Sequence, residues 1–326
     1  MNETTIYDFS PQAAQVDFSK YLIDLSQATQ EPQPLICVAD KPLFTRGNIS
    51  SISGQAKSRK TFLIGLFAAQ FLDLTDSEKI IIFDTEQAIF HVQKSTKRVH
   101  KILEWNDKQN DERLKVFALR ELETAQRKEF VIKAINHYKP DLVFIDGVRD
   151  LLNDFNNIAE SSEIVNALMR LSSENNCHIC AVLHENKGNN SLRGHAGTEL
   201  QNKSESVISV EADGDVSVVS PKYCRNIPFD KFYFRINENG LPEYCNHETK
   251  PKNTDKLKEL FVELLPENVT LNYAEMRNKV MGKCKVTDRT AERRIKSATE
   301  QGIIIKNAVG NYHLPTEIEQ QSECPY

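Results

Sequence analysis

The sequence predicts an α/β protein in which a mainly parallel β-sheet is flanked by helices, with antiparallel hairpins at the sheet edge and a small helical domain after it. Two observations predict this fold class. Between residues 48 and 184, short apolar segments alternate with helical patterns, as they do in a doubly wound parallel sheet. After residue 253 the pattern changes to successive helices and a closing hairpin.

The apolar segments and amphipathic patterns place the elements of the large domain. Strands are expected at residues 35–38, 48–52, 79–86, 115–119, 142–146, 178–183, 207–210, 215–220 and 231–236. Helices are expected at residues 60–72, 88–105, 124–137 and 161–175, and a short helix after residue 198. The last three strands are short and close together, which predicts the antiparallel hairpins.

Composition shifts divide the chain into segments. Its predicted parts are an amino-terminal arm at 1–34 that includes at most one short helix at 18–25, a large domain at 35–245, a linker at 246–253, a small domain at 254–315 and a flexible tail at 316–326.

The composition limits the class of protein. The net charge of −5 and the pI of about 6.0 exclude a polycation, so any nucleic-acid contact must come from a local patch or from assembled subunits. The seven cysteines have no disulfide-framework spacing, and the Cys177 and Cys180 pair fits a buried strand better than a redox or metal motif. The sequence has no apolar run of transmembrane length and no signal-like start, which predicts a soluble cytoplasmic protein without membrane contact.

A loop between the second strand and the first helix matches the phosphate-binding template G-x-x-x-x-G-K-[ST], except that Arg59 replaces its second glycine. Such a loop points backbone N–H groups and a helix dipole at a polyphosphate. Lys60 is expected to reach the β- and γ-phosphates of ATP, and Thr61 to bind Mg²⁺. The predicted nucleotide-binding residues are Gly54, Gln55, Ala56, Lys57, Ser58, Arg59, Lys60, Thr61 and Phe62.

The arginine in this loop leaves an alternative open, because the loop could be a basic, solvated segment before an amphipathic helix. We predict that Arg59 keeps a negative φ and that its side chain points away from the phosphates, since a side chain disfavours positive φ. A left-handed backbone at this position, or a guanidinium that fills the pocket, would favour a degenerate site.

Polar residues at the ends of later strands complete the predicted site. Asp146 ends an apolar strand, where its carboxylate would hold Mg²⁺ together with Thr61. Glu86 ends another such strand and is the predicted general base for water, although Asp84 could share in metal binding. His184 is expected to contact the γ-phosphate or the water, the alternative being a core histidine. Ligands collect at this edge of parallel sheets.

The chain resembles the RecA-like P-loop ATPases. The resemblance lies in the loop 54–61 and, in this order, in the segments 84–87, 142–146, 183–187, 193–194 and 221–226. Within that family the chain resembles the plasmid RepA-type hexameric replicative helicases and related ATPases of mobile elements. The resemblance covers about residues 35–240. It implies a nucleotide-dependent motor that forms a homo-oligomeric ring such as a hexamer, with its active sites between subunits.

The resemblance also implies roles for cations late in the domain. Lys222 and Arg225 stand where the family has residues that reach the nucleotide of the neighbouring subunit, with K-x-x-R spacing here in place of K-x-R. An ordinary basic strand edge is the alternative. The loop 187–193 corresponds to the region that faces the central channel, where Lys187 and Arg193 would follow a DNA backbone. A surface loop without DNA contact is the alternative.

The small domain has the helix, helix, helix and hairpin order of a winged helix-turn-helix. Residues 254–314 hold eleven Lys or Arg against eight Asp or Glu, a net charge of +3 in a chain of net charge −5. This contrast favours DNA contact, and a protein-interaction module is the alternative. The predicted DNA-contacting residues of its third helix are Arg289, Arg293, Arg294 and Lys296.

These observations predict an ATP-hydrolysing, DNA-associated motor. Its expected partners are DNA, further copies of the chain, and replication or mobilisation proteins. Two alternatives stay open. One is an ATP-dependent DNA-binding regulator or loader that does not unwind DNA. The other is a DNA- or protein-binding module with a degenerate nucleotide site, which Arg59 would signal.

Overall fold

The computed structural model describes residue 19 and residues 21–185, 192, 194–246, 253–266, 269–307 and 309–315. The chain divides into two compact units, Met1–Cys245 and Asn246–Tyr326. Each unit has its own hydrophobic core, as expected for separate domains.

In the described part of the first unit, nine strands form one mixed sheet in the order β11-β10-β9-β8-β3-β7-β6-β4-β5. The strands from β8 to β5 are parallel to one another, and β9, β10 and β11 extend the sheet by antiparallel pairing. The bounds are β3 Ile49–Gly54, β4 Ile80–Asp84, β5 Leu114–Ala118, β6 Leu142–Asp146, β7 His178–His184, β8 Ser206–Asp213, β9 Val216–Cys224, β10 Phe232–Ile236 and β11 Pro242–Tyr244.

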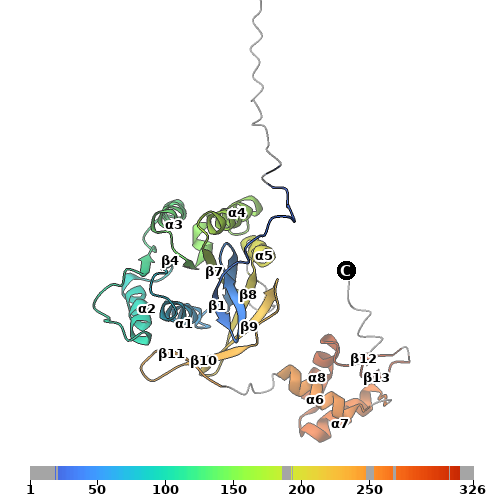
Figure 1. Cartoon of the computed structure of the whole chain (residues 1–326). Helices are drawn as coiled ribbons and strands as arrows, with labels where there is room; N and C mark the ends of the chain where they lie inside the picture. Colours follow the sequence, from blue (N-terminus) through green and yellow to red (C-terminus); the bar gives the residue numbers. More distant parts are fainter. Residues whose placement is uncertain are drawn as a thin grey trace, which may run out of the picture. The chain divides into compact units, whose positions relative to one another are not determined.

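Helices cover both faces of this sheet (Figure 1). The core on one face includes apolar side chains of α1 and α2, and the core on the other face includes those of α3, α4 and α5. The bounds are α1 Lys60–Asp73, α2 Ile89–Ile102, α3 Thr124–Tyr138, the 3-10 helix η2 Val148–Leu151, α4 Ile158–Glu174 and α5 Gly194–Lys203. Because both faces are covered, residues 80–83 of β4, 142–145 of β6 and 179–183 of β7 are apolar, which made these strands easy to predict.

Three details differ from the expectation. The predicted strand at 35–38 is β1 (Pro34–Val38), but among the described residues it pairs only with β2 (Lys41–Thr45), in a separate two-stranded sheet. The first of the three expected edge strands, β8, is parallel to β3, so the antiparallel extension begins one strand later. The short helix expected at 18–25 is wrong over its described residues from 21 onward, where the backbone forms turns and irregular structure.

The parallel pairing brings the important strand ends together. Gly54 at the end of β3 pairs in register with His184 at the end of β7, and Asp84 at the end of β4 pairs with Asp146 at the end of β6. Since β7 and β6 are neighbours, all four ends lie along one edge of the sheet. The loop that leaves β3 therefore faces the polar residues that follow β4, β6 and β7.

The second unit consists of α6 (Asn253–Leu264), α7 (Tyr273–Cys284) and α8 (Asp288–Glu300), followed by the antiparallel pair β12 (Ile305–Lys306) and β13 (Tyr312–His313). Leu271, between the first two helices, forms an additional bridge with Tyr312. Asn272 begins α7 with a capping box, because its side chain accepts from the Glu275 amide while the Glu275 side chain accepts from the Asn272 amide. The element order is the one that the sequence predicts.

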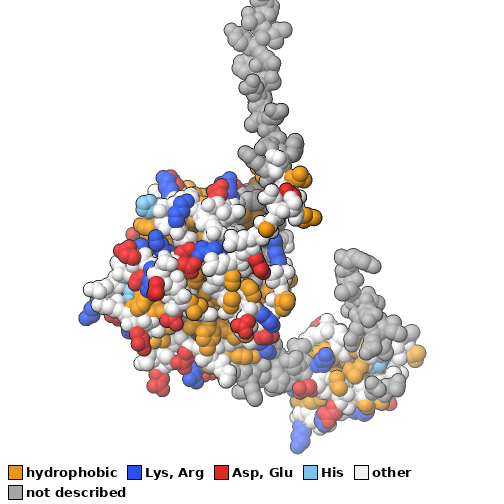
Figure 2. Space-filling model, viewed as in Figure 1, with side chains coloured by type: hydrophobic (Ala, Val, Ile, Leu, Met, Phe, Trp, Pro, Cys, Tyr) orange, Lys and Arg blue, Asp and Glu red, His pale blue; other side chains and the backbone are white. Residues whose placement is uncertain are grey.

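Charged side chains of both signs are interspersed over the face of the first unit that Figure 2 shows. No helix in the described part of the chain has the length and apolar character needed to span a membrane.

Candidate nucleotide-binding site

A cavity of about 430 Å³ lies at the edge of the sheet where the strand ends meet. It is lined by most of the predicted site residues, which are Lys57, Ser58, Arg59, Lys60, Thr61, Phe62, Glu86, Asp146 and His184. Gln55 and Ala56 are exposed on the loop outside this lining. A larger cavity of about 580 Å³, between α2 and the edge strand β5, contains none of these residues.

The backbone of the loop fits a phosphate group. A Cβ atom on Gly54 would stand 2.4 Å from the Val210 carbonyl oxygen and 2.6 Å from Ser58 Oγ, so only glycine fits at this exit from β3. The Ser58 hydroxyl is buried and has no hydrogen-bond partner among the described residues. The amides of Lys60 and Thr61, in the first turn of α1, likewise have no acceptor within that part of the chain. These orphan donors at a helix N-terminus suit an anion.

The prediction for the backbone of Arg59 is wrong. Its φ is +69°, in the left-handed region, and Lys57 has a φ of +65°. The tight turn into α1 requires this conformation, which explains why the template has glycine here. The prediction for its side chain is confirmed, because the guanidinium donates to the Gly214 and Asp215 carbonyl oxygens and does not fill the cradle.

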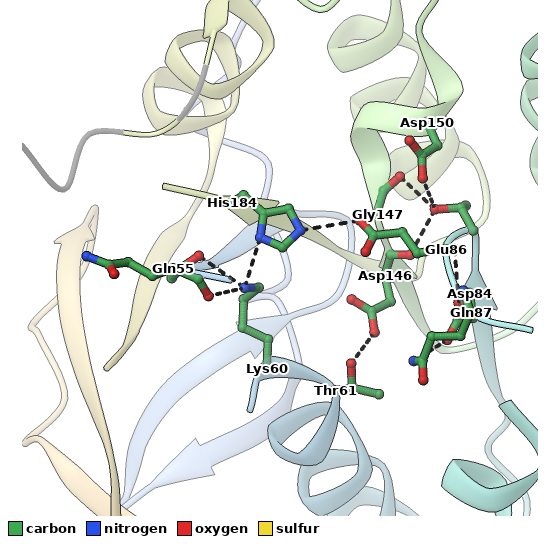
Figure 3. Close-up of polar contacts among 12 residues, drawn as sticks. Gln55, Lys60, Thr61, Asp84, Glu86, Gln87, Asp146, Gly147, Asp150 and His184 are labelled. Carbon is green, nitrogen blue, oxygen red and sulfur yellow. Dashed lines mark hydrogen bonds and ion pairs between the residues drawn. The ribbon is translucent and has the colours of Figure 1, made fainter. Parts of the chain in front are cut away.

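A chain of polar contacts connects Lys60, His184 and Glu86 (Figure 3). Lys60 Nζ donates to the carbonyl oxygens of Gly54, at 3.0 Å, and Gln55, at 2.9 Å, and lies 3.3 Å from His184 Nδ1. His184 Nε2 lies 3.3 Å from Glu86 Oε1. Because an ammonium can only donate, Nδ1 accepts, and the neutral ring then carries its proton on Nε2 and donates it to Glu86.

The environment of Glu86 keeps its carboxylate charged. The hydrogen bond from His184 lowers the pKa of Glu86 more than burial raises it, and the charges of Lys60 and Arg149 lower it further. About half of the Glu86 side chain is exposed, at 51%. An ionised, accessible carboxylate beside the phosphate loop is what a group that orients and deprotonates water needs.

Thr61 and Asp146 form a pair that fits Mg²⁺. Thr61 Oγ1 donates to Asp146 Oδ2 at 2.6 Å. A hydroxyl and a carboxylate are oxygen ligands of the kind that Mg²⁺ prefers, and it commonly takes its other ligands from water and phosphate. No cluster of three or more His, Cys, Asp or Glu side chains that could hold a metal by itself occurs among the described residues. Burial raises the pKa of Asp146 from 3.8 to about 6.

Asp146→Asn is expected to raise the free energy of unfolding by about 3 kcal/mol at pH 7 without Mg²⁺ and nucleotide. Burial raises the pKa of this carboxyl, so the folded protein holds the proton more tightly than the unfolded chain. The resulting stability is full below about pH 4 and is lost as the pH rises towards about 6. Asparagine avoids that loss and can still accept from Thr61. Chemical denaturation at pH 7 and pH 4 tests this, because an equal gain at both pH values would contradict it.

The structure shows a supporting network that the sequence did not reveal. Asp84 accepts from the amides of Glu86, at 3.1 Å, and Gln87, at 2.8 Å, and from the Gln87 side chain, so it shapes the chain after β4. Thr85 Oγ1 lies within hydrogen-bond distance of the Asp146 and Gly147 carbonyl oxygens and of Asp150. The polar sequence after each strand was visible, but these pairings depend on the strand register.

Lys222 and Arg225 have partners within the chain. Lys222 Nζ donates to Glu185 Oε1 at 2.8 Å, and this buried carboxylate also accepts from Ser53. Arg225 donates to the Asn202 and Lys203 carbonyl oxygens at the end of α5. Neither cation lines the cavity of its own chain. Their role towards a neighbouring subunit stays a prediction.

The predicted DNA-contacting residues fall into two groups. Lys187 and Arg193 lie outside the described residues. On α8, the buried face consists of Ala291, Ile295 and Ala298, and the basic residues lie on the remaining surface. Of these, Arg289, Arg293 and Lys296 are exposed and Arg294 is half-buried.

The fold and the site together are those of a P-loop ATPase domain: a mainly parallel sheet carries a phosphate loop, and the Thr61–Asp146 pair and Glu86 lie beside it. A family model described as an AAA domain (AAA_25) matches residues 12–190, more than half of the chain. The chain belongs to this AAA domain family.

Two further comparisons concern individual proteins. The crystal structure of the RadB recombinase is similar with a TM-score of 0.48 and 16% sequence identity, over 63% of this chain and 94% of that chain. No curated protein matches the chain.

Proposed function

We propose that the protein hydrolyses ATP in a reaction coupled to DNA, as a ring-forming motor of the RepA-type helicase kind that its sequence resembles. One observation carries the proposal. Lys60, His184 and Glu86 form a continuous contact chain in the same cavity as the Thr61–Asp146 pair. A phosphate-binding lysine, a metal-binding pair and a candidate base are therefore adjacent.

Hydrolysis at this site needs Lys60 to change partners. Its ammonium has three protons, and three acceptors already lie within reach: the Gly54 and Gln55 carbonyl oxygens and His184 Nδ1. An incoming γ-phosphate would replace at least one of them, because a charged phosphate oxygen is the stronger acceptor. His184 is the residue released from Lys60 most readily, since that contact is the longest of the three.

The reaction itself is a transfer of the γ-phosphoryl group to water. The water oxygen forms a bond to the γ-phosphorus while the bond to the β,γ-bridging oxygen breaks, and Glu86 takes the proton of the water. ADP and phosphate are the products. Bound between Thr61, Asp146 and the phosphates, Mg²⁺ would supply positive charge to the phosphate oxygens. His184 holds the Glu86 carboxylate by donating to it, which orients the base.

A neighbouring subunit is proposed to complete the site with Lys222 or Arg225, as the resemblance to ring-forming ATPases implies. A cation supplied in this way typically increases the rate about 10³- to 10⁵-fold. The proposed partners are therefore further copies of the chain in a ring, together with DNA and with replication or mobilisation proteins.

DNA contact is proposed for the second unit, as a winged helix-turn-helix. Three helices followed by a β-pair, with the Leu271–Tyr312 bridge as a third strand contact, are the elements that this motif contains. The outer surface of α8 carries exposed arginines without a carboxylate partner among the described residues. Such a surface can bind phosphates and base edges.

A second candidate is an ATP-dependent DNA-binding regulator or loader that does not unwind DNA. The pairing of Lys222 with Glu185 and of Arg225 with the end of α5 favours it, because both cations are engaged in their own chain. The third candidate, a degenerate site, regains support from the left-handed φ of Arg59. The intact arrangement of Lys60, Thr61, Asp146 and Glu86 argues against that candidate.

The experiment that tests the proposal is ATP turnover with and without single-stranded and duplex DNA, on protein whose oligomeric state is measured by light scattering. Turnover stimulated by DNA supports the proposal. Unwinding of a forked duplex then distinguishes the motor from the regulator. Absence of ATP turnover under all conditions would favour the third candidate, a binding module with a degenerate nucleotide site.

Arg289→Ala with Arg293→Ala is expected to weaken duplex DNA binding about 10- to 100-fold, since each contact between an arginine and a phosphate or base adds favourable free energy. Both side chains lie on the exposed part of α8. Fluorescence anisotropy at several salt concentrations measures the loss and should also show a shallower salt dependence. The matched control is Arg170→Ala on α4, and equal binding by the α8 variant and this control would contradict the assignment.

A further inference from the structure

Arg59 connects the phosphate loop to the turn between β8 and β9. Its guanidinium donates to the Asp215 carbonyl oxygen at 2.8 Å, to the Gly214 carbonyl oxygen at 3.0 Å and to Ser217 Oγ at 3.2 Å. We propose that Arg59 is a positioning residue that ties the phosphate loop to this hairpin, so that nucleotide binding in the loop is transmitted to β9. This inference rests on the proposed ATP-binding function.

The backbone of the loop needs such a tie. Lys57 and Arg59 both have left-handed φ values, of +65° and +69°, which residues other than glycine rarely adopt. A conformation of this kind persists only where surrounding contacts hold it. The hydrogen bonds of the Arg59 guanidinium are charge-assisted and reach three acceptors at once, a geometry that suits the planar guanidinium fork. They hold the turn that leads into Lys60.

The hairpin also contacts the other end of the loop. Gly54 packs so closely on β8 that a Cβ atom would lie 2.4 Å from the Val210 carbonyl oxygen. The loop is therefore held by the same hairpin where it leaves β3 and where it enters α1. A change in loop shape on phosphate binding has to move, or be resisted by, the residues between Val210 and Ser217.

The strand after the turn leads to the two cations that are predicted to act on a neighbouring subunit. Ser217 belongs to β9, which pairs with β8 on one side and β10 on the other. Lys222 lies further along β9, and Arg225 is the first residue after the end of this strand. The Arg59 tie thus connects the nucleotide site of one subunit with the strand that bears its own intersubunit cations. A glycine at position 59 would give the loop its shape without this connection.

Hydrogen exchange with and without Mg-ATP tests the inference. In the wild-type chain, Mg-ATP is expected to slow exchange at 54–61 and also at 212–218. In Arg59→Ala and Arg59→Gly, Mg-ATP should still slow hydrogen exchange at 54–61 wherever the nucleotide binds. The slowing of exchange at 212–218 should be at least several-fold smaller than in the wild type. Arg59→Lys, which keeps the charge but loses the fork, should also lose most of the hairpin response. Ser217→Ala, which removes one acceptor, should reduce it less.

Comparing Arg59→Gly with Arg59→Ala separates the effect of the backbone conformation from the effect of the side-chain contacts. Alanine keeps the unfavourable φ and loses the tie, so its affinity for ATP should fall about 10-fold, whereas glycine adopts this φ freely and should lose less. Arg170 is an exposed arginine on α4, so Arg170→Ala is the control for loss of charge. Wild-type protection at 212–218 that survives in both variants would overturn the inference. No protection at 54–61 in the wild type would instead overturn the proposed ATP binding.

Discussion

Glu86→Gln is expected to lower ATP turnover at least about 100-fold while ATP binding stays within about two-fold of the wild type. The glutamine carbonyl oxygen can still accept the hydrogen bond that His184 Nε2 donates to Glu86 Oε1 at 3.3 Å. The amide cannot take a proton from water, so the chemical step alone loses its base. Single-turnover hydrolysis and equilibrium ATP binding, measured on the same preparation, check both parts of the expectation.

The matched control for this substitution is Glu112→Gln. Glu112 is a surface glutamate whose side chain is 95% exposed and pairs with Lys115 outside the cavity. Its variant should turn over ATP like the wild type. Unchanged turnover in Glu86→Gln would remove Glu86 as the base, and an equal loss of binding and turnover would indicate that it serves the shape of the site.

The sequence predicted the parts of the fold that depend on burial. The central strands β4, β6 and β7 are mostly apolar because helices cover both faces of the sheet, and the parallel pairing of β6 with β7 brings Asp146 and His184 to one edge. The pairing of β1 with β2 alone could not be predicted, since a short apolar strand has the same pattern in a large or a small sheet. Likewise, nothing in the pattern of β8 distinguishes parallel from antiparallel pairing with β3.

The site was predictable where a residue type is needed by the chemistry, and not where a partner is chosen by the fold. The phosphate template predicts Gly54, Lys60 and Thr61. It does not predict the pairing of Lys222 in β9 with Glu185 after β7, because that pairing depends on how the strands are arranged in the sheet. Arg59 shows the limit most clearly. Local preference predicts a negative φ for Arg59, but the turn into α1 places it in the left-handed region, and its side chain contacts the β8–β9 turn. The geometry of the turn thus overrides the local preference of the residue.

Lys60→Ala is expected to weaken ATP binding about 100-fold or more and to abolish turnover. Each hydrogen bond between a charged group and its partner contributes about 1.5–3 kcal/mol, and 2.7 kcal/mol corresponds to roughly 100-fold in affinity. Lys60 is the buried cation of the cavity, and burial lowers its pKa, so its ammonium already bears a desolvation cost that a phosphate partner would offset. Isothermal titration with ATP and Mg²⁺ measures the loss.

Stability separates this effect from damage to the fold. Removing the ammonium leaves the Gly54 and Gln55 carbonyl oxygens without its hydrogen bonds, but it also removes a desolvated charge, so the free energy of unfolding should change by less than about 1 kcal/mol. Lys133→Ala on α3, where the lysine is exposed and paired with Glu129, is the control and should bind ATP normally. If Lys60→Ala keeps both its stability and wild-type affinity, the loop is not the phosphate site, because no other lysine lies so deep in this cavity among the residues that line it.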